Sequence, residues 1–555
     1  MSSHYAIPKT FAPAQRMWPG KTIDRSPAWC AVDLRDGNQA LPNPMTPAQK
    51  WRYFELLTEI GFKEIEIGFP SASADDFQFC RDLIEKNAIP DDVVISVLTQ
   101  AREHLIRRTF EALKGVKRAI VHVYIATSDL HMGFVFGKTA EQTKAIALES
   151  VALIRQLADA MPESRIGLEF SPEEFTDTNL DFAVDICDSV IDTWNPKAGE
   201  KVVINLPATV ERHLPIHYAD MIEGYMARQR RGDAAIISLH AHNDMGSAVA
   251  ATEMALMAGA HRVEGTLFGH GERSGNVDLV TLALNMQYLG IETGLDFRRL
   301  EGIRAEIEEL TDMPVSPRHP YAGELVFSAF SGSHQDAIHK GLDRREELAE
   351  HFGGWKLPYL HIDPADLGRS YERFIRINSQ SGKGGIAHVL STEYGVRLPR
   401  QLLVDLSRHV QTFADQQARE VSAKEVWEIF RGIYLKPEGA LRLVNYWPRP
   451  RTDDPATIEG EVQVVHRDGE QRVFAVGNGP IAAFTHALRK LPGIPVFTLT
   501  EYEEDALGTS VDAEAIAYVR LENAAGEGFY GIGFGANIDQ AAVRAIVSSL
   551  NRMIG

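Results

Sequence analysis

A chain of 555 residues is longer than one hydrophobic core of ordinary size, so we expect two or three domains. Hydrophobic residues make up 44% and charged residues 24% of the sequence, which is typical of a globular protein. A formal net charge of -19 argues against a nucleic-acid-binding surface and favours an enzyme of small metabolites, while leaving open a local basic pocket for an anion.

The N-terminal arm, residues 1–28, is polar and irregular, and it lacks the apolar run of a signal peptide. No later stretch reaches the roughly 18 apolar residues of a membrane span, so we expect no membrane partner. Cys30, Cys80 and Cys187 are few and odd in number, which is typical of reduced thiols. These features predict a cytoplasmic protein.

Apolar strand patterns alternate with helical patterns between residues 29 and 300. The expected strands are residues 29–36, 64–70, 93–99, 119–127, 165–170, 201–207, 234–240 and 261–268. The helical stretches include residues 46–61 and 139–160, each with a threonine before the first turn. This pattern predicts an α/β protein whose catalytic domain is a (β/α)8 TIM barrel. A doubly wound sheet is the alternative, but no G-x-G-x-x-G follows the first strand.

Polar clusters follow several of these strands, where barrel enzymes carry their active sites. They are DLRDGNQ at 33–39, EFSPEE at 169–174, LPATVE at 206–211, HAHND at 240–244 and GHGERSGN at 269–276. Because all eight strands of such a barrel run in one direction, we expect these clusters on the same rim.

His240 and His242 lie two positions apart at a strand end, where strand alternation points both imidazoles the same way. Asp36 would complete a set of two histidines and one carboxylate for a divalent ion, with substrate and water in the open positions. This set suits Mg, Mn, Zn or Fe, so the ligands alone do not choose the metal. The alternative is that both histidines are simply hydrogen-bonded in the barrel mouth.

Four polar side chains near the rim have more than one interpretation. Arg35 could hold a substrate carboxylate through two hydrogen bonds, or it could form an ion pair with Glu173 or Asp33. Glu272 and Arg273 could pair with each other or contact substrate. Asn276 could reach the metal or its water.

Together these residues resemble the metal-dependent Claisen-condensing acyltransferases, which share a barrel with acyl-CoA lyases. RDGNQ, HAHND and GERSGN are the general signatures of that group. LPATVE (206–211), FSGSHQDAIHKG (330–341), PYLHIDP (358–364) and NSQSGKGG (378–385) are similar to the long form of the 2-isopropylmalate synthases. The resemblance covers nearly the whole chain.

The resemblance implies Asp36, His240 and His242 as metal ligands, with Asn276 nearby. It implies that Arg35 and Thr209 bind the keto acid. For acid-base work it implies Glu173, His334 and Tyr359, with Glu169 as a neighbouring candidate for the base. Without the resemblance, His334 would be interpreted as a capping or surface histidine and Tyr359 as a packed aromatic residue.

The implied reaction condenses acetyl-CoA with 3-methyl-2-oxobutanoate and hydrolyses the thioester, the first committed step of leucine biosynthesis. The implied cofactor is a divalent metal, Mg²⁺ first and Mn²⁺ or Zn²⁺ as alternatives, together with a monovalent cation such as K⁺. A homodimer inhibited by leucine is expected from the family. Lys383 could lie near a CoA phosphate or in an exposed glycine-rich turn.

Residues 301–435 are predicted to form a helical linker, and a separate α+β domain is predicted from 455 to 555. Residues 472–490 and 529–553 of this domain look alike, since each has a strand, glycines and an amphipathic helix. Backbone N–H groups at two facing helix starts would bind a carboxylate, and small residues would leave room for an apolar side chain. The resemblance favours a leucine site there over glycine-assisted packing. Its residues are expected to be Gly477, Asn478, Gly479, Ile481, Ala482 and Ala536.

Three other functions compete with this interpretation. A citramalate synthase would take pyruvate as the keto acid, and LPATVE and FSGSHQDAI argue against it. An acyl-CoA lyase would break the bond instead of forming it and would need no end-product sensor. A leucine-binding regulator on an inactive barrel would have no need of Arg35, Asp36, His240, His242 and Asn276 together.

Overall fold

The computed structural model describes residues 4, 6, 8, 10–369, 383–417, 421–467, 469–507 and 513–555. It divides into two compact units, residues 1–326 with 364–369, and residues 327–363 with 370–555. Residues 378–382 of the NSQSGKGG motif lie outside the described residues. Among the described helices, none has the length and apolar character needed to cross a membrane. All three cysteines are buried and unbridged.

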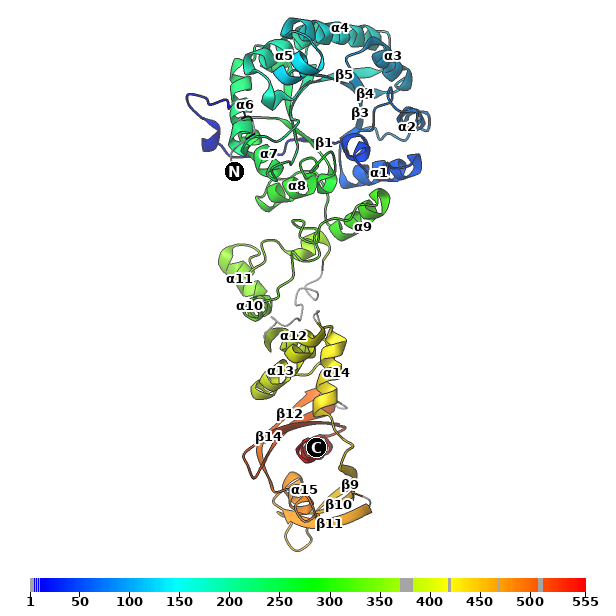
Figure 1. Ribbon diagram of the computed structural model, residues 1–555. Helices are drawn as coiled ribbons and strands as arrows, with labels where there is room; N and C mark the ends of the chain where they lie inside the picture. The colour runs from blue at the N-terminus through cyan, green and yellow to red at the C-terminus, as the bar shows by residue number, and fades with distance from the viewer. Residues whose placement is uncertain are drawn as a thin grey trace. The chain divides into compact units, whose positions relative to one another are not determined.

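The first unit contains a closed barrel of eight parallel strands in the order β1 to β8 (Figure 1). The strands are β1 Ala28–Ala31, β2 Glu64–Glu66, β3 Val94–Gln100, β4 Arg118–Ala126, β5 Arg165–Glu173, β6 Val202–Ala208, β7 Ala235–Ala241 and β8 Arg262–Gly265. Closure rests on the pairing of β1 with β8, for example Cys30 with Glu264. The predicted barrel is therefore confirmed, and the open doubly wound sheet is excluded.

Eight helices surround these strands (Figure 1). They are α1 Pro47–Ile60, α2 Ala74–Glu85, α3 Glu103–Ala112, α4 Ala140–Asp159, α5 Leu180–Trp194, α6 Pro215–Arg228, α7 Ala248–Ala258 and α8 Leu279–Tyr288. The threonines that the sequence places before two of the helices, Thr46 and Thr139, are N-caps. Each accepts a hydrogen bond from the backbone N–H of a glutamine three residues later, and that glutamine bonds back to the cap.

The first strand is shorter than the predicted strand 29–36. It ends at Ala31, and the chain then forms a wide π-helical turn, η2, over Asp33–Gly37. The carbonyl oxygen of Val32 accepts hydrogen bonds from the backbone N–H groups of Arg35, Asp36 and Gly37 at 2.9 to 3.2 Å. Because the turn coils the backbone at the strand end, it brings Arg35 and Asp36 together over the barrel mouth.

The region after the barrel is helical. Its helices are α9 Leu300–Thr311, α10 Gly332–Asp343, α11 Arg345–Phe352, α12 Lys383–Tyr394, α13 Arg400–Gln417 and α14 Ala423–Tyr434. Buried residues of α12, α13 and α14 share one apolar cluster with Ile516 and Ile532 of the following domain. The linker helices thus complete their core with strands from the C-terminal part of the chain.

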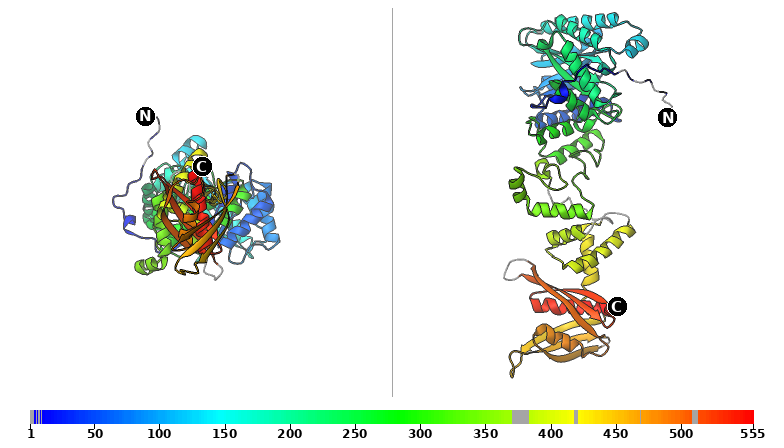
Figure 2. Two further views of the ribbon diagram at one scale, coloured as in Figure 1. Left: turned by 90° about the horizontal axis from the view of Figure 1, so that it is seen from below. Right: turned by 90° about the vertical axis from the view of Figure 1, so that its left-hand side faces the viewer.

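The C-terminal domain repeats one arrangement, three antiparallel strands followed by a helix. The first copy is β9 Leu441–Pro450, β10 Ile458–His466, β11 Gly469–Gly477 and α15 Pro480–Leu488. The second copy is β12 Phe497–Leu507, β13 Glu514–Asn523, β14 Gly528–Gly535 and α16 Ile538–Ile554. Both helices lie between the two sheets and share one core with them (Figure 2).

The domain starts earlier than residue 455, the boundary that the sequence suggested. Strand β9 pairs with β10 over residues 441–450, so it belongs to the first sheet. Its prolines, Pro448 and Pro450, made this stretch resemble a linker. They fit because β9 is an edge strand, where a missing N–H costs no ladder bond.

Candidate active site

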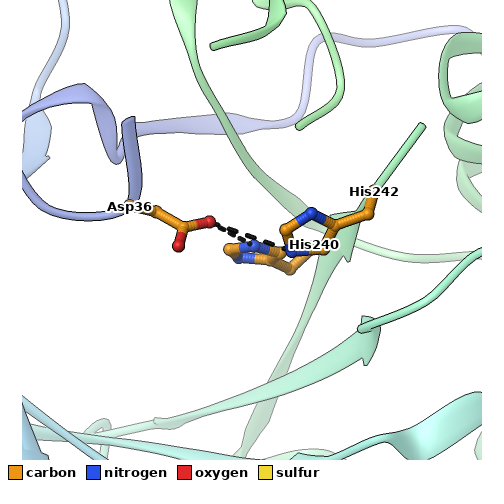
Figure 3. Close-up of side chains that lie close together, drawn as sticks. All are labelled: Asp36, His240 and His242. Carbon is orange, nitrogen blue, oxygen red and sulfur yellow. Dashed lines mark ion pairs between the residues drawn. The ribbon is translucent and has the colours of Figure 1, made fainter. Parts of the chain in front are cut away.

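Asp36, His240 and His242 meet at the carboxyl ends of β1 and β7 (Figure 3). The Oδ2 atom of Asp36 lies 3.3 Å from Nε2 of His240 and 3.9 Å from Nε2 of His242. All three side chains are buried, with 4 to 7% of each residue exposed. The structure thus brings together the two predicted histidines and the predicted carboxylate.

Charge and burial together set the protonation of this group. Burial would raise the pKa of Asp36, but Arg35, His240 and His242 outweigh it and hold that pKa well below its usual range. Burial lowers the pKa of His240, yet Asp36 and Glu264 outweigh burial and raise it to about 9. Burial and the neighbouring His240 lower the pKa of His242 to about 4. The three groups therefore form a buried site that favours an added positive charge beside Asp36.

The geometry fits a divalent ion. Two ligands at about 2.1 Å from one ion lie roughly 3 Å apart when their bonds meet near a right angle. The separation of Asp36 Oδ2 from Nε2 of His240, 3.3 Å, is close to this value, and the separation from Nε2 of His242, 3.9 Å, is somewhat longer. Within the described residues Asp36 Oδ2 makes no well-aligned hydrogen bond. Histidine nitrogen and carboxylate oxygen are the donors that such an ion takes with open positions for substrate.

Asn276 lies beside this group. It pairs with His242 as an isolated antiparallel bridge, and its Nδ2 donates to the carbonyl oxygen of His270 at 2.9 Å. Its Oδ1 is buried and has no hydrogen-bond partner among the described residues. The residue that pairs with His242 through its backbone thus carries a buried oxygen acceptor without a partner among the described residues.

Arg35 does not pair with Glu173 or Asp33, the ion pairs that the sequence suggested as its alternative. Its Nε donates to Glu66, and its Nη1 donates to Asp36 Oδ1 at 2.7 Å. Glu66 lies on β2, next to β1 in the barrel, whereas Asp33 points to Tyr53 and the backbone N–H of Leu267. Two carboxylates therefore fix the guanidinium at the edge of the metal group.

A cavity of about 310 Å³ opens over the metal group. Its lining includes Arg35, Asp36, His240 and His242 together with Glu173 and Thr209. Burial, opposed chiefly by the charge of His131, raises the pKa of Glu173 above its ordinary value. The Oγ1 of Thr209 accepts a hydrogen bond from the backbone N–H of Glu174 at 2.9 Å, which fixes the end of β6 against the end of β5.

Glu272 and Arg273 also line the cavity, but they do not pair with each other. Arg273 donates to Asp244 at 2.6 Å and to the carbonyl oxygen of Thr209 at 2.6 Å. It thus ties the HAHND turn to the end of β6. Glu272 accepts a hydrogen bond from Gln39 at 3.4 Å.

The remaining acidic and aromatic candidates are Glu169, His334 and Tyr359. Glu169 is fully buried inside the barrel, where Arg262 holds its carboxylate, and it is not among the residues that line the cavity. His334 on α10 and Tyr359 belong to the second unit, where their rings stack with centroids 3.9 Å apart. Tyr359 is 62% exposed and adopts a left-handed backbone conformation with φ of 60°.

A buried polar network inside the barrel was missed by the sequence reasoning. It contains Glu66, His122, Ser171, Asn205, Arg262 and Glu264. The residues lie on strands β2, β4, β5, β6 and β8. The signal in the sequence was a polar residue in the middle of an apolar strand, as in VINL and RVEG. Burying polar and charged side chains is unfavourable unless each of them has a hydrogen-bond partner. These residues serve as partners for one another.

In the C-terminal domain, the expected leucine-site residues border the start of α15 and the end of β14. Gly479 is the N-cap of α15 and offers no side chain to cap the helix. A cavity of about 310 Å³ lies nearby, between β9 and the start of α16. Its lining includes Tyr446, Asn537 and Asp539 and none of the six expected residues, so their role stays a prediction.

Family comparisons cover most of the chain. Residues 26–307 match the HMGL-like model, 324–391 match the alpha-isopropylmalate synthase post-catalytic domain-like model, and 420–554 match the LeuA allosteric (dimerisation) domain model. Among solved structures, a hydroxymethylglutaryl-CoA lyase from Pseudomonas aeruginosa is 18% identical with a TM-score of 0.44. It covers 54% of this chain and 97% of its own.

Curated relatives match over nearly their full length. A 2-isopropylmalate synthase from Ralstonia nicotianae is 49% identical, covering 97% of this chain and 92% of the relative. One from Rhodospirillum rubrum is 48% identical over 97% and 96%, and one from Azotobacter vinelandii is 46% identical over 99% and 97%. With a barrel model and full-length relatives in agreement, the chain belongs to the 2-isopropylmalate synthase family.

Proposed function

We propose that this protein is an acyltransferase that condenses acetyl-CoA with 3-methyl-2-oxobutanoate and hydrolyses the thioester to 2-isopropylmalate and CoA. The observation that carries the proposal is one cavity lined by Asp36, His240, His242, Arg35 and Glu173. It lies in a chain that is 46 to 49% identical to curated 2-isopropylmalate synthases. The cavity offers a cation site, a guanidinium and a carboxyl group, which are the groups that this condensation needs.

Asp36, His240 and His242 would hold the divalent metal, with Asn276 in its outer sphere. We propose Mg²⁺, with Mn²⁺ or Zn²⁺ as alternatives, and a monovalent cation such as K⁺ as an additional component. When bound, a divalent ion supplies positive charge where the keto oxygen becomes negative. The buried carboxylate of Asp36, held ionised by its neighbours, supplies the negative charge that retains the ion.

Arg35 and Thr209 would hold the keto acid. Glu66 and Asp36 already fix the guanidinium, so it loses little freedom when it binds a carboxylate. Its Nη2 would donate to the substrate carboxylate, and the Thr209 hydroxyl would donate to a second oxygen. Both residues line the same cavity, which supports this assignment.

Proton transfer would fall to Glu173, His334 and Tyr359. The acetyl methyl group is a weak carbon acid, so a positioned base must take its proton, an assistance worth roughly 10²–10⁴-fold. The raised pKa of Glu173 suits a carboxylate that takes up a proton more readily than an exposed one. We assign the base to His334, with Glu173 orienting it or sharing the task, and hydroxyl donation to Tyr359.

Acetyl-CoA needs more room than the metal cavity provides. A second cavity of about 730 Å³ adjoins it, and the two share Tyr124 and Glu173 in their linings. Arg102 and Lys138 also line the larger cavity and could pair with phosphate groups. We propose that the thioester enters from this side, so that its methyl group passes Glu173.

We also propose that the protein is a homodimer inhibited by leucine. The match of residues 420–554 to the LeuA allosteric (dimerisation) domain supports this regulation. The leucine carboxylate would meet the N–H groups at the start of α15, near Gly477, Asn478 and Gly479. Ile481, Ala482 and Ala536 would surround its apolar side chain.

The decisive experiment follows release of the free thiol from acetyl-CoA in the presence of 3-methyl-2-oxobutanoate or pyruvate. Each keto acid is tested with Mg²⁺ and with EDTA, and the product is identified by mass spectrometry. Metal-dependent release with preference for the branched acid is expected. Preference for pyruvate would instead indicate citramalate synthesis, and cleavage of 3-hydroxy-3-methylglutaryl-CoA without condensation would indicate a lyase.

A further inference from the structure

Glu264 of β8 connects three buried partners at the bottom of the metal group. Its Oε2 accepts a hydrogen bond from Nδ1 of His240 at 2.8 Å and from Nδ2 of Asn205 at 3.0 Å. Its Oε1 accepts from Nη1 of Arg262 at 2.6 Å. Glu264 is 1% exposed, so water does not compete for these bonds. Each of its oxygens is thus committed to a donor on a barrel strand.

Arg262 fixes the carboxylate in this position. Its guanidinium is fully buried and also donates to Ser238 and Glu169, while its Nε donates to Glu64 at 2.6 Å. A guanidinium held by several acceptors on different strands has one available orientation. It therefore sets both the charge and the direction of the Glu264 carboxylate.

A second metal site does not explain this arrangement. Ligand atoms of His122, Glu169 and Glu264 lie close enough together to suggest one. The cation already present there is Arg262, whose Nη1 and Nη2 donate to both carboxylates. The group is therefore an ion-pair cluster centred on Arg262, in which Glu264 serves as a hydrogen-bond acceptor.

The Glu264 carboxylate fixes the orientation of the His240 ring. An ionised carboxylate only accepts hydrogen bonds, so it holds a proton of His240 on Nδ1 and makes Nε2 the atom that can give up its proton to a metal ion beside Asp36. Nε2 is the atom that lies 3.3 Å from Asp36 Oδ2. Ring orientation and the proton on Nδ1 are thus both set from the barrel interior.

The same network reaches the keto-acid side of the cavity. Asn205 Nδ2 also bonds to Ser171 Oγ at 3.0 Å, and Ser171 bonds to Nε2 of His122 at 2.7 Å. Nδ1 of His122 bonds to Glu66 at 2.7 Å, and Glu66 holds Arg35. A continuous chain of hydrogen bonds thus joins His240 to Arg35 through the barrel core.

We propose that Glu264 is a positioning residue that orients His240 for metal binding, with Arg262 as the cation that holds Glu264 in place. The inference rests on the metal centre of the proposed function. Removing a partner of this kind from a metal-bound histidine typically weakens metal affinity by about 10- to 100-fold. Glu264 is expected to act on the metal equilibrium and not to contact substrate.

The test compares Glu264→Gln with Glu64→Gln. A glutamine at 264 has one acceptor oxygen and an NH₂ group, so an N–H must face His240 or Arg262, both of which are donors. Glu64 bonds to the same guanidinium but does not touch His240, and its side chain is one quarter exposed. It is therefore a matched control for the general loss of an Arg262 ion pair.

Mn²⁺ affinity of the full-length protein is measured by the paramagnetic resonance signal of free Mn²⁺, which needs no turnover. Glu264→Gln is expected to raise the Kd by about 10- to 100-fold, and Glu64→Gln to leave it within about twofold. At saturating Mn²⁺ the condensation rate of Glu264→Gln is expected to recover most of its loss. A folded Glu264→Gln that binds Mn²⁺ like the unsubstituted chain, or an equal loss in both variants, would overturn the proposal.

Two further results keep the test decisive. If Glu264→Gln does not fold, Glu264→Asp replaces it, because it keeps the charge for Arg262 and withdraws the carboxylate from His240 by ~1.5 Å. The Kd for Mn²⁺ is then expected to rise by about 10- to 100-fold in Glu264→Asp and to stay within about twofold in Glu64→Gln. If the unsubstituted chain binds no Mn²⁺, the metal centre itself is wrong, and the role of Glu264 is wrong with it.

Discussion

Oδ2 of Asp36 lies 3.3 Å from Nε2 of His240, although Asp36 belongs to the turn after the first strand and His240 to the seventh strand of the barrel. The contact exists because the π-helical turn after β1 contains Asp36 and because His240 is the penultimate residue of β7. It fixes where a cation can lie, since both atoms face the cavity that also contains Arg35 and Glu173.

Asp36→Asn is expected to weaken Mg²⁺ and Mn²⁺ binding by more than the roughly 10- to 100-fold typical of an outer-sphere partner. The reason is that the amide removes the negative charge and a ligand oxygen together. Calorimetric titration of the full-length protein measures the change. The control is Asp92→Asn, an exposed carboxylate paired with Lys63, which should bind metal normally. Unchanged affinity of Asp36→Asn would remove this residue from the ligand set.

Arg35→Lys is expected to raise KM for the keto acid by about 10- to 100-fold. The reason is that the ammonium group of lysine cannot donate several N–H groups in one plane, as a guanidinium does. The affinity for CoA should stay nearly constant. Steady-state kinetics in both substrates separate the two effects. Arg52→Lys, at an exposed ion-pair cluster on α1, is the matched control. A rise in the KM for acetyl-CoA alone would contradict the assignment of Arg35 to the keto-acid carboxylate.

The pH profile reports on Glu173. Because burial raises the pKa of this carboxyl group, it stays protonated to a higher pH than an exposed glutamate. Glu173 can orient the base His334 or share in taking the proton only when its carboxyl group is ionised, so kcat/KM should fall as the pH falls through a value above 4.5, the ordinary value for glutamate. Glu173→Gln should lower the rate by about 10²-fold or more and remove this acidic limb.

The control for Glu173 is Glu111→Gln, an exposed residue of α3 that pairs with Arg108. Its pH profile should match that of the unsubstituted chain. If Glu173→Gln keeps both the rate and the acidic limb, the proton transfer belongs to another residue, and the same measurement on His334→Gln becomes the next step.

Leucine sensitivity is predicted to depend on the small residues at the start of α15. Ala482→Leu would fill the space expected for the ligand side chain, and overpacking of this kind costs about 1–3 kcal/mol, which is roughly 5- to 150-fold in affinity. The leucine concentration for half-inhibition should rise accordingly, with kcat unchanged. Ala506→Leu, on an exposed part of β12, is the control. Equal inhibition of both variants would place the leucine site elsewhere.

A point substitution is a cleaner test of regulation than deletion of residues 455–555. That deletion would remove β10 from β9 and uncover Val426 and Phe430 of α14, which pack against Ile516 and Ile532. Exposing an apolar cluster of this kind favours aggregation. Loss of activity after such a deletion would therefore report on packing as well as on regulation.

Much of this molecule follows from local patterns in the sequence. The alternation of eight apolar strands with helices fixed the barrel, because each pattern matches its own repeat of two or 3.6 residues. Thr46 and Thr139 marked two helix starts through their side-chain oxygens. The spacing of His240 and His242 indicated two imidazoles on one side of a strand end.

Other features depend on contacts between distant strands, which no local pattern contains. The partners of Arg35 could not be found from its neighbours in sequence, since Glu66 approaches it only when β1 and β2 pair. Likewise Glu264 meets His240 only because β7 and β8 lie side by side. The sequence determined which chemical groups reach the rim, through the strand repeat. The tertiary structure decided which partners orient them, because closure of the barrel brings side chains from separate strands within hydrogen-bond distance.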